Sequence, residues 1–296
     1  MIEPIPVFIV HWNKPESCGR SIEAFLSQGI PVRIVILDNG SEPAKLSYLY
    51  ALIDNRAVIR ELGRNMGFGG ALNIALKDWL SNSQEPYAVV AAHDALPMSG
   101  CIVKLITVLN MFPRVGIVSP EYGIGHKAQF SALRGPYLVP HPRGSGFEPQ
   151  AYAHGTLMCI RRECLQDIGL FDERYFAYGD EIDLALRAWH HGWEVGVVWG
   201  AIVDNPETSV PSPVACYLQL RNACLLVRNW KGWHWGLVRC MVALGGTCLG
   251  LIIPSRRTYH FSTTARFLAI MHALMGHYGP PPPFLSTLSE RKRFSA

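Results

Sequence analysis

Continuous runs of apolar residues, many of them β-branched, alternate with longer amphipathic stretches through most of the chain. Runs without polar interruption are typical of strands that are buried on both faces of a parallel sheet. The predicted strands, several of which contain or end in polar residues, lie at residues 6–12, 32–41, 57–62, 87–94, 115–120 and 193–204. Helical periodicity fills several intervals, around residues 15–26 and at 69–80, 100–112, 180–191 and 212–229. This order predicts an α/β fold, a mostly parallel central sheet flanked by helices.

Two segments interrupt the alternation. Residues 121–152 are rich in Gly, Pro, His and Arg, which predicts a loop or hairpin before regular structure resumes at residues 153–169. The sequence "GPPPP" at residues 279–283 predicts the end of the compact structure.

The composition is that of a protein with a large core: 296 residues, 49% hydrophobic and 17% charged. The N-terminus has no positively charged region before its short apolar run, so we expect a first strand and not a signal peptide, and a cytoplasmic protein. Eight cysteines are scattered without a CxxC pair. This argues against a structural zinc site and favours reduced, mostly buried thiols.

Charge is distributed unevenly. Residues 228–296 carry nine of the 27 Lys and Arg residues but one of the 23 acidic residues, and three tryptophans stand near their start, Trp230, Trp233 and Trp235. A basic, apolar and Trp-rich segment suits an anionic membrane surface better than nucleic acid, which calls for a more uniformly polar basic face. We therefore expect no nucleic-acid partner.

These features predict two domains, one over residues 1–229 and a helical, membrane-associating extension over 230–296. The most apolar run, residues 240–253, is shorter than the roughly 20 residues that span a bilayer. Attachment to one face of the membrane is the favoured interpretation. A buried core helix and a spanning helix are the alternatives.

Polar residues follow several of the predicted strands. In an open parallel sheet, ligands bind outside the carboxyl ends of the strands. This rule predicts that three groups of residues lie close together: His11–Asn13, Asp38 and Asn39, and His93 and Asp94. Their side chains are of types suited to binding a nucleotide. Asp94 could coordinate a hard cation that bridges phosphate oxygens, or it could be an ordinary turn residue.

The glycine-rich sequence "GRNMGFGGALN" at residues 63–73 leads into a predicted helix, so its backbone amides could face a phosphate or a ribose. It lacks the GxGxxG pattern and follows the third strand instead of the first, which argues against a dinucleotide-binding dehydrogenase. The pattern GxxxxGK[ST] is absent, which argues against a P-loop protein.

The sequence "YFAYGDEIDLALR" at residues 175–187 contains three carboxylates within four positions. They could simply open a helix, where acids complement the free amides and the helix dipole, with Asp183 paired to Arg187 one turn later. They could equally be part of an active site. The helix interpretation does not explain the aromatic residues that immediately precede the acids.

Five segments in order resemble the inverting, family 2 type glycosyltransferases of the GT-A fold, particularly the rhamnosyltransferase-like branch. The resemblance covers about residues 5–230. The segments are "VFIVHWN", "VILDNGS", "GRNMGFGGALNIAL", "VVAAHDALP" and "GTLMCIRRECLQDIGLFDERYFAYGDEIDLALRAWHHGW".

The resemblance implies a role for each matching residue. The segment from Val10 through His11 to Asn13, together with Asp38, would bind the nucleobase and ribose of a nucleotide-diphospho-sugar, with Asn65, Gly67 and Asn73 nearby. Asp94 would hold Mg²⁺ or Mn²⁺ on the donor diphosphate. The pair Asp180 and Glu181 would supply the general base that activates an acceptor hydroxyl.

The chain departs from the family pattern in three places. The metal motif reads His93-Asp94-Ala95, with one acid fewer than usual. The order Asp180-Glu181 is the reverse of the common one, which leaves the base undecided between them. Asp204 stands where many relatives have a metal-ligating His, although an Asp can also ligate Mg²⁺.

The sequence thus predicts a hexosyltransferase for polysaccharide biosynthesis at the inner face of the cell membrane. It would use a UDP- or dTDP-sugar, for example dTDP-rhamnose, and a glycan or lipid-linked acceptor. The three departures favour one alternative, a catalytically inactive GT-A domain that serves as a binding or scaffold subunit. A nucleotidyltransferase is disfavoured, because no glycine-rich loop with Arg or Lys follows the first strand.

Overall fold

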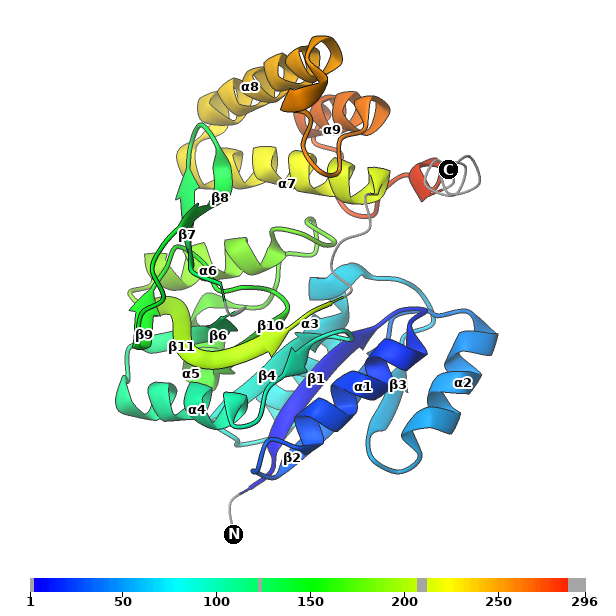
Figure 1. Ribbon diagram of the computed structural model, residues 1–296, viewed down its shortest axis with the longest axis vertical. Coiled ribbons are helices and arrows are strands. Elements are labelled where there is room, and N and C mark those ends of the chain that lie inside the picture. The colour runs from blue at the N-terminus through cyan, green and yellow to red at the C-terminus, as the bar shows by residue number, and fades with distance from the viewer. Residues whose placement is uncertain (1–2, 122–123, 207–211, 287–296) are drawn as a thin grey trace. The chain divides into compact units, whose positions relative to one another are not determined.

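The computed structural model describes residues 3–121, 124–206 and 212–286 (Figure 1). They form two compact units. The first takes its described residues from 1–129, 138–172 and 181–208, and the second from 130–137, 173–180 and 209–296. The predicted boundary after residue 229 falls inside helix α7 (Pro213–Lys231) of the second unit. The division into domains at that position stays a prediction.

A twisted sheet forms the centre of the first unit, with strand order β3-β2-β1-β4-β10-β6-β11-β5 and β9 paired to β11. Its strands are β1 (Ile5–His11), β2 (Val32–Asp38), β3 (Val58–Glu61), β4 (Tyr87–Ala92), β5 (Leu96–Pro97), β6 (Val115–Glu121), β9 (Gly146–Pro149), β10 (Leu157–Arg161) and β11 (Glu194–Asp204). The pairs β1–β2, β2–β3, β1–β4 and β6–β11 are parallel, and β10 runs antiparallel between β4 and β6. Each of the six predicted strands is present.

Helices cover both faces of this sheet. Helices α1 (Pro15–Leu26), α2 (Pro43–Ile53) and α4 (Cys101–Met111) pack on the face that Val7 and Ile9 of β1 present. Helices α3 (Gly67–Asn82), α5 (Arg162–Ile168) and α6 (Asp180–His190) pack on the face of Phe8 and Val10. All residues of β1 are therefore buried, and each large apolar side chain contributes roughly 1.5–3 kcal/mol. The predicted α/β architecture is confirmed.

Helices form the second unit: α7, α8 (Trp233–Ile252), the short η1 (Pro254–Arg256) and α9 (Thr263–Met275). Helix α7 begins after Ser212, whose hydroxyl accepts the backbone N–H of Val214 at 3.2 Å. The prediction that compact structure ends at residues 279–283 is wrong, because Leu285 is fully buried in the core of this unit. Residues 126–140 form the predicted hairpin, made of β7 (His126–Ser131) and β8 (Gly135–Pro140).

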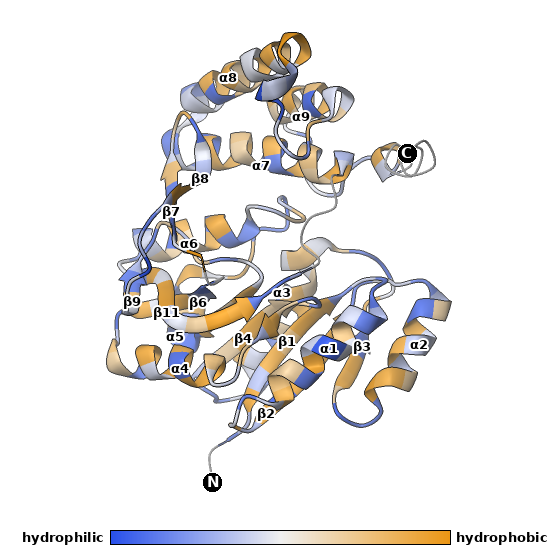
Figure 2. Ribbon diagram, viewed as in Figure 1, coloured by the Kyte–Doolittle hydropathy of each residue, from blue (hydrophilic) through white to orange (hydrophobic). Residues whose placement is uncertain are grey.

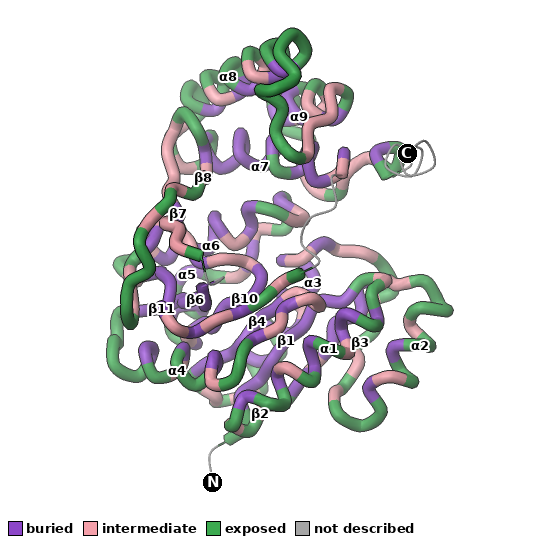
Figure 3. Tube along the Cα trace, viewed as in Figure 1, coloured by how far each residue is buried: buried purple, intermediate pink, exposed green. Residues whose placement is uncertain are grey.

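Helix α8 is longer than the apolar run suggested. It spans 20 residues, and by length and composition it is the one helix in the described ranges that could cross a membrane. A single helix of this kind is weak evidence for a membrane span. Only 28% of its most apolar window is buried, and Met241 and Ile252 are 66% and 78% exposed. Most of α8 is therefore exposed, which disfavours the interpretation as a buried core helix. Figure 2 shows apolar residues along α8, and Figure 3 shows much of this helix as exposed.

The cysteines agree with the prediction of reduced, buried thiols. All eight are free, and Cys248 alone is exposed.

Candidate active site

The carboxyl ends of β1 and β2 bring His11 and Asp38 side by side, since the two residues are direct partners in the parallel register. Nδ1 of His11 lies 2.9 Å from Oδ1 of Asp38, and both side chains are buried. The backbone N–H of Ser41 donates to Oδ2 of Asp38 at 3.1 Å. Burial alone would raise the pKa of Asp38, but the hydrogen bonds from His11 and Ser41 outweigh it and leave that pKa below its usual value. Asp38 is thus held as a carboxylate.

Asn39 and Asn65 organise the glycine-rich segment next to this pair. Nδ2 of Asn39 donates to Oδ1 of Asn65 at 3.1 Å and to the carbonyl oxygen of Gly67 at 3.0 Å. The backbone N–H groups of Met66 and Gly67 donate to Asn39 and Asn65, at 2.8 and 2.9 Å. Two of the first amides of α3 are therefore already hydrogen-bonded within the protein.

Val10, Asn13 and His93 complete this edge of the sheet. The carbonyl oxygen of Val10 accepts the backbone N–H of His93 at 3.1 Å, and the His93 ring meets that of His11 edge-on at 5.9 Å between centroids. Asn13 has a positive φ of 55°, and its Oδ1 accepts the backbone N–H of Glu42 at 2.7 Å. The strand-end rule thus correctly grouped these residues.

Asn73, which we grouped with Asn65 and Gly67, bonds to the backbone of Phe171. It is buried in α3, donates from Nδ2 to the carbonyl oxygen of Phe171 at 2.9 Å and accepts the N–H of Phe171 at 3.0 Å. These two hydrogen bonds attach α3 to residues 169–172, the segment that precedes α6.

Asp94 and Asp204 are brought to the same end of the antiparallel pair β5–β11. Asp204 is the direct partner of Leu96, which lies two residues after Asp94. The described residues contain no group of three or more His, Cys, Asp or Glu side chains that could hold a metal ion. Two carboxylates fit a Mg²⁺ or Mn²⁺ that takes its remaining ligands from substrate phosphates and water.

The acidic pair begins α6, as the sequence predicted. Asp180 is 1% exposed, whereas Glu181 is half-buried. The Glu181 side chain lies against Gly155: a Cβ on that glycine would be 3.3 Å from Cγ and 3.4 Å from Cδ of Glu181. Gly155 precedes Thr156, whose carbonyl oxygen accepts the N–H of Ala92 at 3.0 Å. Glu181 therefore lies near the end of β4. That strand ends at Ala92, two residues before Asp94.

The body of α6 is fixed to the first unit. Asp183 pairs with Arg187 at 3.0 Å, as the spacing predicted. The Arg187 guanidinium also donates to the carbonyl oxygens of Ile168 and Leu170, at 2.6 and 2.7 Å. Trp189 donates from Nε1 to the carbonyl oxygen of Gln150 at 3.0 Å. These contacts set the direction of the helix that carries Glu181.

The loop before β10 contributes two neighbours of Glu181 that we did not predict, Tyr152 and Gly155, with His154 between them in the chain. Burial, and after it the charge of Glu181, raise the pKa of Tyr152. Nδ1 of His154 accepts the backbone N–H of Thr156 at 3.2 Å, and burial lowers the pKa of His154 to about 4. Tyr152 and His154 border a cavity of about 110 Å³ with Glu121, Gln150 and Trp199 among its other walls.

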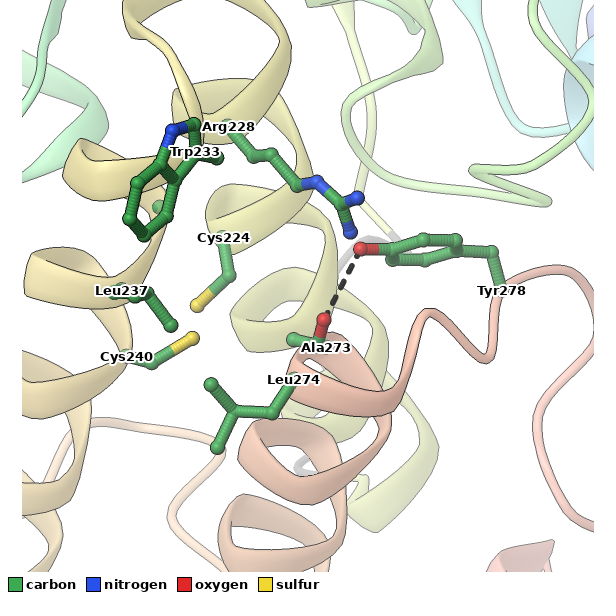
Figure 4. A pocket seen from close by; sticks show the side chains of 9 residues that line it. Cys224, Arg228, Trp233, Leu237, Cys240, Ala273, Leu274 and Tyr278 are labelled. Carbon is green, nitrogen blue, oxygen red and sulfur yellow. Dashed lines mark hydrogen bonds between the residues drawn. The ribbon is translucent and has the colours of Figure 1, made fainter.

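A second cavity, of about 210 Å³, lies within the helical unit. Figure 4 shows the sulfur atoms of Cys224 and Cys240 facing each other inside it, with Arg228 next to the hydroxyl of Tyr278 at one end. That hydroxyl donates to the carbonyl oxygen of Ala273 at 3.2 Å. None of the predicted site residues lines this cavity.

The sequence of the chain is similar to those of known glycosyltransferases. The chain is 26% identical to an N-acetylglucosaminyl-diphospho-decaprenol L-rhamnosyltransferase of Mycobacterium tuberculosis, over 65% of this chain and 73% of the relative. It is 24% identical to a low-salt glycan biosynthesis hexosyltransferase of Haloferax volcanii, over 76% of each.

The fold matches a mannosyltransferase from Pyrobaculum calidifontis, solved in complex with GDP-Man and Mn²⁺, with a TM-score of 0.58 and 15% identity over 92% of this chain and 87% of that one. The fold is the GT-A fold. The sequence model for glycosyl transferase family 2 matches residues 7–169, and that for glycosyl transferase family group 2 matches residues 138–280. The chain belongs to glycosyl transferase family 2.

Proposed function

We propose that this glycosyltransferase moves a sugar, with inversion, from a nucleotide-diphospho-sugar to a hydroxyl of a glycan or lipid-linked acceptor. The observation that supports it most is the position of Glu181, which lies against Gly155 near the end of β4 and Asp94. A carboxylate and a candidate cation site at one edge of the sheet are what transfer from a diphosphate donor needs.

Glu181 is the general base in this proposal. A base must come within hydrogen-bond reach of the hydroxyl that it deprotonates, and Glu181 is half-buried whereas Asp180 is 1% exposed. The acceptor oxygen gives its proton to Glu181 and forms a bond to the anomeric carbon. The bond from that carbon to the diphosphate oxygen breaks on the opposite face, and the electron pair leaves with the nucleoside diphosphate.

His11, Asn13 and Asp38 at the ends of β1 and β2 would bind the nucleoside part of the donor. Asp38 is a carboxylate in a buried hydrogen-bonded setting, which suits it to accept hydrogen bonds from a base or ribose. Asp94 and Asp204 would hold Mg²⁺ or Mn²⁺. When bound, the ion would stabilise the negative charge of the departing diphosphate. The Mn²⁺ in the complex of the Pyrobaculum mannosyltransferase supports this assignment.

The acceptor side of the proposal rests on the helical unit. Its stretch from residue 212 to 286 contains no Asp or Glu and seven Arg or Lys residues. Large apolar side chains of α8 and α9 are exposed, including Met241, Ile252 and Met275. An apolar surface with only positive charge favours an anionic membrane, where a lipid-linked acceptor would be found. The named substrate of the mycobacterial relative is of that kind. We place the enzyme at the cytoplasmic face of the membrane.

One observation favours the second candidate, an inactive GT-A domain that binds but does not transfer. The described residues contain no group of three or more side chains that could hold a metal ion, so the candidate cation site has few ligands from the protein. In that case a nucleotide would still bind to the edge of β1, β2 and β4, and no sugar would be transferred.

The test is a screen of UDP-, dTDP- and GDP-sugars with the full chain, each with Mg²⁺ or Mn²⁺. Release of the nucleoside diphosphate in the presence of a polyprenyl-diphosphate-linked sugar, with inverted anomeric configuration in the product by NMR, would support the proposal. A rise in melting temperature with a nucleotide but no release with any donor would support the inactive domain. Neither effect with any donor would contradict both.

A further inference from the structure

The segment from Arg174 to Gly179, which leads directly into α6, has an unusual backbone. Phe176 and Tyr178 have φ angles of 67° and 65°. Among the described residues, two others besides glycine, Asn13 and Asp54, have positive φ. Bulky side chains rarely adopt this conformation, and it persists where the surrounding structure imposes it. Something must therefore hold this segment in place.

Asn222 of α7 supplies the restraint. Its Nδ2 lies 2.8 Å from the carbonyl oxygen of Tyr175, 2.8 Å from that of Ala177 and 2.7 Å from that of Tyr178. Asn222 is 1% exposed, so these bonds form away from water. A single side-chain amide thus gathers three carbonyl oxygens from four consecutive residues.

Arg221, the neighbouring residue, holds both the amide and the start of the segment. Its Nε donates to Oδ1 of Asn222 at 3.0 Å, which fixes the orientation of the amide. Its Nη2 donates to the carbonyl oxygens of Tyr175 and Arg174, at 3.2 and 3.4 Å, and Nη1 donates to that of Gly279 at 2.8 Å. Arg221 is fully buried, and its hydrogen-bond acceptors are all neutral. Within the described part of the chain, Arg221 thus donates to three backbone carbonyl oxygens.

Gly179 closes the segment against α7. Its φ is 107°, and a Cβ there would contact Cδ1 of Leu226 at 3.3 Å and Cβ of Asn222 at 3.6 Å. Glycine is needed for both the backbone angle and the close approach. Only Asp180 separates Gly179 from Glu181 in the chain.

We propose that Asn222 is a positioning residue for sugar transfer. It holds the Tyr175–Tyr178 backbone in its left-handed conformation and thereby places Glu181 for proton removal, with Arg221 orienting the amide. The inference rests on the proposed function, because it needs Glu181 to be the base. It assigns the role to a side chain of α7 whose hydrogen bonds go to the protein backbone and to Arg221.

The test compares Asn222→Ala, Asn222→Gln and Glu181→Gln in the full chain, with the donor that the screen identifies. Gln219→Ala is the matched control, since Gln219 is an exposed amide on the same helix. We expect Asn222→Ala to lose about 100-fold in kcat, while the donor KM and the melting-temperature shift with UDP or dTDP and Mn²⁺ stay at wild-type values. Asn222→Gln should recover part of the lost kcat, and Gln219→Ala should match the wild type.

Asn222→Asp guards against a variant that does not fold. It keeps the size of the side chain and the acceptor for the Arg221 guanidinium, and it removes the donors to the three carbonyl oxygens. A folded Asn222→Asp or Asn222→Ala protein with wild-type kcat would overturn the inference, as would a kcat loss no larger than the loss of folded protein. If Glu181→Gln is inactive while the Asn222 variants are active, the inference alone fails. If Glu181→Gln is active, the proposed base fails, and the inference fails with it.

Discussion

Gly155 and Glu181 lie so close that a single methyl group on the glycine would touch the carboxylate-bearing side chain, 3.3 Å from its Cγ. The contact joins the loop before β10 to the first turn of α6. It gives the position of that carboxylate a direct test.

Gly155→Ala should move the Glu181 carboxylate by a few tenths of an ångström or force another rotamer. We expect kcat to fall by about tenfold or more, because proton transfer depends on geometry, with little change in donor KM. Steady-state kinetics check this. Gly245→Ala is the control, since a Cβ there meets nothing within 4 Å. Equal kcat values for Gly155→Ala and the wild type would show that Glu181 does not act from this position.

Asp94 and Asp204 should act as one unit if they hold the same ion. Asp94→Asn and Asp204→Asn should each weaken Mn²⁺-dependent binding of UDP or dTDP by about tenfold or more, measured by titration calorimetry. The double variant should lose much less than the two single losses added together, because the first substitution already removes most of the site. Glu163→Gln, an exposed carboxylate on α5, is the control. Fully additive losses would contradict a shared ion.

His154 should make the fold sensitive to mild acid. Its pKa in the folded protein is about 4, below the usual value of about 6.5, so between these pH values the unfolded chain binds a proton that the folded chain does not. Stability therefore falls as the pH falls through this window, by up to about 1.4 kcal/mol per pH unit. His154→Gln should flatten the melting temperature between pH 7 and pH 5, and His234→Gln, at an exposed histidine, should not. An unchanged slope in His154→Gln would contradict the lowered pKa of His154.

The exposed face of α8 should bind anionic vesicles. Replacing Met241 and Ile252 together by Gln removes two of the most exposed apolar side chains and should reduce flotation of the full chain with phosphatidylglycerol vesicles by about tenfold or more. Met111→Gln is the matched control, as Met111 is also 66% exposed but lies on α4. Substitution is preferable to truncation, because Gly279 bonds to Arg174 and Arg221. Flotation equal to the wild type would contradict membrane attachment through this face.

The sequence predicted the sheet well because strands buried on both faces are continuously apolar, as in β1. It did not reveal α2, for a physical reason. Of that helix only Leu49 and Ile53 are buried, while the apolar Tyr48 and Tyr50 are exposed, so its sequence has no clear apolar stripe.

The residues at strand ends could be grouped from the sequence, since parallel strands deliver their carboxyl ends to one edge. The neighbours of Glu181 could not. Gly155 lies 26 residues before Glu181 in the chain, and a glycine in a loop carries no sign in the sequence of the side chain that it will contact. The two hydrogen bonds between Asn73 and Phe171 could not be predicted either, because nothing in the sequence marks the two residues as partners. The place of Asn73 near the nucleotide stays a prediction.

The measurement that tests the account most directly compares Glu181→Gln with Asp180→Asn in the same transfer assay, with nucleotide binding measured in parallel. We predict that Glu181→Gln loses roughly 100- to 10,000-fold in kcat and still binds the nucleotide with Mn²⁺ as the wild type does. Asp180→Asn should lose much less. Transfer by Glu181→Gln at the wild-type rate would contradict the central claim.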